Sequence, residues 1–204
     1  MDTSQLEPDC SHNNPIKVTF YSSIIDEACS VKLVQRIATK TFDAIHRSLV
    51  FESWLKKRKV VVKIWEISRT SAGEQTLEIY ENEKKALQVL SGSGFTPAVL
   101  FDGYYPQHAY HPEARILITE WRQGERLRTC WPKMSPDQKG MVREQLLQFF
   151  LLAMERGIFH DDLRHLRNTL RDAEANQLTI LDFEMVGVRW ALVFHYQWPP
   201  DEST

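Results

Sequence analysis

Two charged residues lie where the sequence pattern predicts buried structure. Lys63 is in the β-branched run 59–65, in which strand alternation puts it on the same face as Trp65. A lysine head group among apolar neighbours needs an anionic partner. Glu83, in a predicted helix over 74–91, could supply that partner and hold the ammonium group toward a phosphate. Taken singly, each residue is more often an ordinary surface charge, so a chemical role depends on further polar positions.

A second polar group follows the next predicted helix. The loop over 157–168 is more polar than a turn requires, because it carries His160, Asp161, Asp162, Arg164 and Asn168. Further along, the apolar strand 178–181 ends abruptly on Asp182. A carboxylate at a strand end can bind a hard divalent cation, and an Asn side-chain oxygen nearby can add a second ligand. These residue types therefore indicate a site for a divalent cation.

The elements that must position these residues are expected in the order strands, one helix, strands, a long helix and short strands. Strands are expected over 17–21, 59–65, 97–105 and 115–121, and helices over 74–91 and 135–157. The segments 31–37 and 42–50 fit either a strand or a helix. Ser135 with Gln138 three residues later has the pattern of a capping box. Because the elements do not alternate as βαβ units, the sequence predicts an α+β fold with two lobes.

The expected domains are a disordered tail over 1–15, a first lobe over 16–122 with the sheet and one helix, and a reduced second lobe over 123–204. The second lobe ends in an apolar segment, 188–198, which is rich in aromatic residues. Each large ring left exposed loses on the order of 1.5–3 kcal/mol of burial. We therefore expect this segment to pack on the long helix of its lobe, or else to form a homodimer contact.

Composition argues against several classes of protein. The 204 residues include 25 Lys and Arg against 27 Asp and Glu, a net charge of −2 that argues against a nucleic-acid-binding module. No apolar run reaches the roughly 18 residues of a membrane span, and the first residues lack the basic and apolar parts of a signal peptide. Three scattered cysteines form neither a disulfide framework nor a metal motif. The expectation is an intracellular, cytoplasmic protein without a membrane partner.

Taken in order, the motifs resemble those of the protein-kinase-like superfamily. Residues 61–63 resemble its V-A-I-K strand, and residues 82–90 the helix whose glutamate pairs with that lysine. Residues 118–124 look like the hinge that binds adenine through backbone groups. Residues 160–164 are similar to the catalytic loop H-R-D-L-K, and residues 182–184 to the metal-binding motif D-F-G. The resemblance implies a protein-kinase-like two-lobed fold with a truncated C-lobe.

The resemblance also implies a function, an ATP- and Mg²⁺-dependent phosphotransferase or ATPase that acts on a small molecule or a partner protein. Lys63, held by Glu83, would bind the α- and β-phosphates of the nucleotide. The adenine would lie against Glu120, Trp121 and Arg122.

The remaining family residues would carry the transfer itself. Asp162 would orient the attacking hydroxyl and accept its proton, with His160 as structural support. Arg164 would neutralise the transferring phosphate, and Asn168 and Asp182 would bind Mg²⁺.

Departures from the family pattern support an alternative, a pseudokinase that binds nucleotide or regulates a partner without catalysis. The first 72 residues contain no glycine, and the turn expected over 37–42 carries side chains that obstruct a close approach to phosphate. Asp162 and Asn168 are six residues apart, where the family has five. Glu184 replaces the glycine of D-F-G, a change that such proteins tolerate. In size the chain resembles the small kinase of the tRNA-modifying KEOPS complex and short, divergent fungal kinase-like proteins.

Overall fold

The computed structural model describes residues 10–22, 28–41, 47–67, 71–105, 113–160, 163 and 166–184. The chain divides into two compact units. The first contains residues 1–84 and 98–121, and the second contains residues 85–97 and 122–204. The described part is mostly β, with 44% strand against 31% helix.

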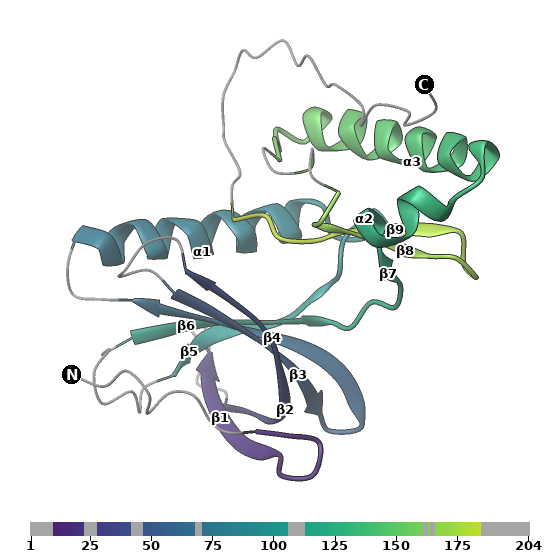
Figure 1. Cartoon of the computed structure of the whole chain (residues 1–204). Coiled ribbons are helices and arrows are strands. Elements are labelled where there is room, and N and C mark those ends of the chain that lie inside the picture. The colour runs from purple at the N-terminus through teal and green to yellow at the C-terminus, as the bar shows by residue number, and fades with distance from the viewer. Residues whose placement is uncertain are drawn as a thin grey trace. The chain divides into compact units, whose positions relative to one another are not determined.

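A closed, six-stranded antiparallel barrel forms the main part of the first unit (Figure 1). Around the barrel the strand order is β1-β2-β3-β4-β6-β5. The strands are β1 (Ile16–Ser22), β2 (Ala28–Thr41), β3 (Arg47–Leu55), β4 (Arg58–Ile67), β5 (Val99–Tyr105) and β6 (Glu113–Glu120). Strand β2 is long enough to pair with β1 near its start and with β3 over the rest of its length.

The barrel interior is filled by alternate residues along the strands, those whose side chains face inward. These are β-branched, aliphatic and aromatic side chains, all buried: Phe20, Val31, Leu33, Leu49, Phe51, Val60, Val62, Ile64, Ala114, Ile116 and Ile118. Where β1 meets β5, the described residue pairs are Tyr21 with Tyr104 and Ser22 with Gly103. A Cβ atom at Gly103 would lie 2.0 Å from the carbonyl oxygen of Tyr21, so only glycine allows the two strands to approach this closely.

The closed barrel shows that the expected α+β, protein-kinase-like two-lobed fold with a truncated C-lobe is wrong. The ambiguous residues 31–37 belong to β2, and residues 47–50 belong to β3. The turn expected over 37–42 is also wrong as far as it is described, because β2 continues to Thr41. Register shifts in the β2–β3 pairing, after Leu33 and Arg36, are irregularities that bend and twist a strand. A sheet bent in this way can pair its first strand with β5 and close.

Helix α1 (Ser71–Val89) covers the outer face of β4 with its residues up to Lys84, which belong to the first unit. Its buried positions follow helical spacing and include Thr76, Tyr80 and Glu83. The indole of Trp65 meets the ring of Tyr80 edge-on, with 5.3 Å between the ring centroids. Strand β4 is therefore buried on both faces, which explains its nearly continuous apolar sequence.

The second unit contains a small three-stranded sheet and a long helix (Figure 1). The sheet is formed by β7 (Glu125–Arg126), β8 (Thr169–Asp172) and β9 (Gln177–Ile180), and the helices are α2 (Leu127–Cys130), the 3₁₀ turn η2 (Trp131–Lys133) and α3 (Pro136–Glu155). The predicted capping box of α3 is confirmed: Ser135 Oγ accepts from the Gln138 N–H, and the Gln138 side chain accepts from the Ser135 N–H. Phe149 lies on the buried face of α3 and contacts Phe95, with 5.8 Å between the rings.

Candidate functional site

The predicted ion pair between Lys63 and Glu83 is confirmed. Lys63 Nζ lies 2.6 Å from Glu83 Oε2, and the two side chains are only 9% and 7% exposed. Strand alternation turns Lys63 away from the barrel interior, and helical spacing places Glu83 on the same face of α1 as Tyr80. The ammonium also lies 4.8 Å from the ring centre of Trp65. The result is a buried cation that an adjacent carboxylate holds in place.

A second polar contact fixes the part of α1 that carries Glu83. Lys84 Nζ lies 2.9 Å from Asp102 Oδ2 on β5, and the Tyr80 hydroxyl donates to the same oxygen over 3.5 Å. Burial raises the pKa of Tyr80 far above its ordinary value, and the negative charge of Asp102 raises it further. The phenol therefore stays protonated. Two ion pairs from consecutive helical residues, Glu83 and Lys84, attach α1 to the barrel.

The residues expected to bind adenine are largely engaged in contacts of their own. The Glu120 N–H donates to the carbonyl of Ala98 over 3.0 Å, and the Glu120 carboxylate pairs with Arg58 and accepts from the Ala98 N–H. The ring of Trp121 lies under the ammonium of Lys59, with 3.7 Å from Nζ to the ring centre. The backbone N–H of Glu120 already donates a hydrogen bond within the chain, so it is not available to bind an adenine base.

Arg122 opens the second unit, where its guanidinium donates to the carbonyl of Thr96 over 3.2 Å. This contact ties the segment after β6 to the segment that precedes β5.

In the second unit, two predicted site residues are tied to the segment that leads to Asp182. The ring of His160 is buried, with Nε2 3.1 Å from the carbonyl oxygen of Leu181 and the ring centre 4.8 Å from that of Phe183. Asn168 is also buried, and its carbonyl accepts from the Leu181 N–H over 2.7 Å. His160 and Asn168 therefore both contact the segment that leads to Asp182.

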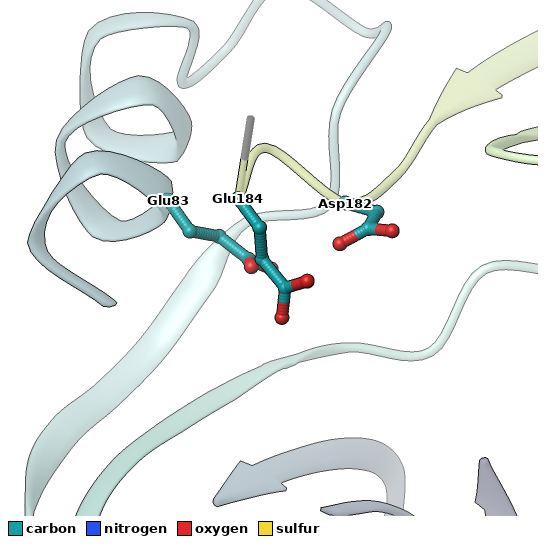
Figure 2. A group of neighbouring side chains, drawn as sticks. All are labelled: Glu83, Asp182 and Glu184. Carbon is teal, nitrogen blue, oxygen red and sulfur yellow. The ribbon is translucent and has the colours of Figure 1, made fainter. Parts of the chain in front are cut away.

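Asp182 has a backbone φ of +66°, a left-handed conformation that is uncommon for residues other than glycine. Figure 2 shows that Asp182 and Glu184 project from the segment after β9, whereas Glu83 projects from α1. Carboxylate oxygens of Asp182 and Glu184 lie within 4.8 Å of one another, and Glu184 is buried. Like charges this close repel each other, and a divalent cation bound between them would remove the repulsion.

Glu184 is the residue that the sequence analysis missed as a candidate ligand. The sequence contains a signal for it, because a second carboxylate follows Asp182 by two residues, but the motif resemblance accounts for Glu184 only as a tolerated replacement of glycine. The backbone turn at Asp182 brings the two carboxylates near each other.

Several predictions fall on residues that the structure does not describe. Asp162 and Arg164 lie outside the described residues, as do the apolar segment 188–198 and residues 1–9 of the expected tail. The proton-accepting role of Asp162 and the phosphate-neutralising role of Arg164 therefore stay predictions. Among the helices of the described ranges, none is both long and apolar enough to cross a membrane.

Comparisons with known proteins add no assignment. No protein-family model matches the chain, and no curated protein matches it significantly.

Proposed function

We propose that the chain is an ATP- and Mg²⁺-dependent phosphotransferase or ATPase that works in the cytoplasm, as its protein-kinase-like motifs imply. The observation that carries the proposal is the buried Lys63–Glu83 pair. Desolvating two charges costs several kcal/mol per ion, which the attraction between them roughly offsets. A pair that adds so little to stability is better explained by a use for the ammonium, and binding phosphate is the use that the motifs imply.

The proposed activity does not require the two-lobed architecture. Phosphoryl transfer is catalysed almost entirely by positioning and charge stabilisation, and the same chemistry occurs on unrelated folds. ATP would supply the phosphoryl group, and Mg²⁺ would neutralise its negative charge. The chain's own contribution would be a fixed ammonium at Lys63 and a set of hard oxygen donors at Asn168, Asp182 and Glu184, the ligand type that Mg²⁺ prefers.

The proposed acceptor is a hydroxyl group of a small molecule or of a partner protein. Asp162 would accept its proton, and Arg164 would stabilise the charge on the transferring phosphate. Both roles follow from the motif resemblance alone.

The two parts of the proposal are tested by different variants, at Lys63 and Glu83 for nucleotide binding and at Asp182 for the metal. Nucleotide affinity is measured by calorimetry with ATP, with and without Mg²⁺, and turnover by release of ADP. Ligand at 100 times its Kd should raise the free energy of unfolding by about 2.7 kcal/mol. Lys63→Met combined with Glu83→Gln should remove ATP binding while preserving the fold, and Asp182→Asn should remove the Mg²⁺ dependence.

Matched controls are available in the same elements. Lys85→Met changes an exposed lysine of α1, and Asp172→Asn changes an acid of β8 whose Oδ1 accepts two backbone N–H bonds. Both should leave ATP binding unchanged. Absence of any Mg²⁺-dependent binding at millimolar ATP would refute the proposal. Binding without turnover would favour the pseudokinase, an alternative supported by strand structure at 37–41 in place of a phosphate-binding turn.

A further inference from the structure

One row of side chains crosses four strands of the barrel on its outer face. In the strand register Lys17 lies opposite Lys32, Lys32 opposite Trp54, and Trp54 opposite Lys59. Paired residues share a face of the sheet, and neighbouring strands lie about 5 Å apart. The row therefore sets three amines and one indole side by side over about 14 Å. It lies outside the barrel, because the alternate positions along the same strands form the core.

Four lysines on this side of the barrel carry charge that no carboxylate among the described residues compensates. Lys17 and Lys32 are exposed in the row, and Lys56 and Lys57 are exposed at the tip of the β3–β4 hairpin (Figure 1). Within the described ranges, none of these four has a carboxylate within ion-pair distance. Lys59, by contrast, lies 3.0 Å from a carboxylate of β3. Positive charge is thus concentrated on one face of a chain whose net charge is −2.

Two aromatic rings are exposed on the same outer face. Trp54 is 39% exposed and Tyr21 is 38% exposed. Tyr21 follows Lys17 by four residues on β1, so both project outward, and between them Thr19 forms a hydroxyl–hydroxyl hydrogen bond of 2.9 Å with Ser30 of β2. The surface therefore combines rings, amines and hydroxyls, which are the groups that contact bases, phosphates and sugars.

We propose that this face, defined by Lys17, Tyr21, Lys32, Trp54, Lys56 and Lys57, binds single-stranded nucleic acid. Bases would stack on the indole of Trp54 and on the ring of Tyr21, and the amines would contact phosphates. The indole of Trp54 is flanked by amines on the neighbouring β-strands. This arrangement suits a single-stranded nucleic acid, in which bases and phosphates alternate. A duplex offers no free base face to these rings, and an anionic membrane offers no alternation of rings and charges.

Local positive charge on this face would allow the chain to bind a nucleic acid although its net charge is negative. At physiological ionic strength charges are screened beyond about 8 Å, so groups at the face act mainly on what touches it. The other charges of the chain still reduce attraction at longer range, and we expect a Kd on the order of micromolar to 100 micromolar. This inference is independent of the proposed phosphotransferase activity, since it uses none of the same side chains.

The test is fluorescence anisotropy of a labelled thymidine 20-mer titrated with the full chain at several salt concentrations. Four phosphate contacts predict a slope of about −2.8 for log K against log salt. Lys17→Ala with Lys32→Ala should reduce the slope to about −1.4. Trp54→Ala should weaken binding about 5- to 150-fold with the slope unchanged, and Trp54→Phe should restore most of the affinity. Lys85→Ala, an exposed lysine of α1, is the matched control.

Circular dichroism melting of each variant checks that the barrel is intact, because all the substituted side chains lie on its surface. Absence of binding at 100 micromolar protein and low salt would overturn the proposal. It would also be overturned if Trp54→Ala bound the 20-mer as tightly as the unmodified chain. Equal affinity for vesicles of anionic phospholipid would identify a membrane-binding or general polyanion surface in its place.

Discussion

Removing one charge of the Lys63–Glu83 pair should destabilise the protein far more than removing both. With 2.6 Å between Nζ and Oε2, the two charges attract each other by about 6 kcal/mol at an effective dielectric constant of about 20. Withdrawing them from water costs several kcal/mol per ion, so the net contribution of the intact pair is near zero. Lys63→Met alone leaves the buried Glu83 carboxylate without the ammonium that faces it, which we expect to cost about 3–5 kcal/mol.

Urea denaturation followed by circular dichroism measures this in a double-mutant cycle. Glu83→Gln alone should cost a similar amount, because it leaves the ammonium of Lys63 buried without its main partner. The double variant, Lys63→Met with Glu83→Gln, removes both charges. Its free energy of unfolding should lie within about 1 kcal/mol of that of the unmodified chain. The two single effects together therefore exceed the double effect by at least about 5 kcal/mol, which is the expected coupling energy.

The control for this cycle is Lys85→Met on the exposed side of the same helix, which should change stability by less than about 0.5 kcal/mol. A cycle in which the two single effects simply add would refute the reasoning, because it would mean that the charges do not interact strongly. A double variant as unstable as either single variant would refute it too, by showing that packing at these positions dominates the charges.

Four further outcomes follow from particular side chains. Ser135→Ala removes half of the capping box of α3 and should lower the free energy of unfolding by about 1 kcal/mol, whereas Ser135→Asp should retain most of it, as denaturant titration would show. Burial first, and the charge of Asp102 second, raise the pKa of Tyr80 above its unfolded value of 10.0. The unfolded chain therefore loses this proton at a lower pH than the folded chain, and the free energy of unfolding should fall as the pH rises above about 10. Tyr80→Phe should make this fall smaller in denaturation curves measured at high pH. Gly103→Ala puts a methyl group 2.0 Å from a carbonyl oxygen of β1 and should lower the free energy of unfolding by about 1–3 kcal/mol. Amide hydrogen exchange in β1 and β5 should become faster, because the clash lies between these two strands. Burial first, and the charge of a nearby glutamate second, raise the pKa of the Cys130 thiol. Its reaction with a thiol reagent at neutral pH should therefore require unfolding, because the thiolate is the reactive form. Rapid labelling of the folded chain would contradict this.

Local patterns in the sequence predicted the local features well. Alternation in β4 places Lys63 opposite the core residues, and helical spacing places Glu83 toward the sheet. These patterns allow the ion pair, and the motif resemblance names Glu83 as the partner of Lys63. The capping box at Ser135 was equally predictable, because it depends on two residues within one helical turn.

Closure of the barrel could not be predicted in the same way. It depends on β1 pairing with β5, two segments far apart in the sequence. Gly103 indicates that another backbone can approach β5 closely, but it does not identify that backbone as β1. It depends also on bends in β2, at positions where no glycine or proline signals an irregularity. The left-handed φ at Asp182 could not be predicted either, because aspartate rarely adopts this conformation and nothing in the sequence indicates it.

The joint between β1 and β5 has a consequence for the behaviour of the protein in concentrated solution. A closed sheet leaves no strand with unpaired backbone groups, and so protects the chain from pairing with other copies of itself. Opening this joint would expose the backbones of both strands at once, including the aromatic residues Tyr21 and Tyr104 beside them. Self-association that depends on protein concentration should therefore begin under conditions that loosen the joint, before the interior of the barrel is exposed to water.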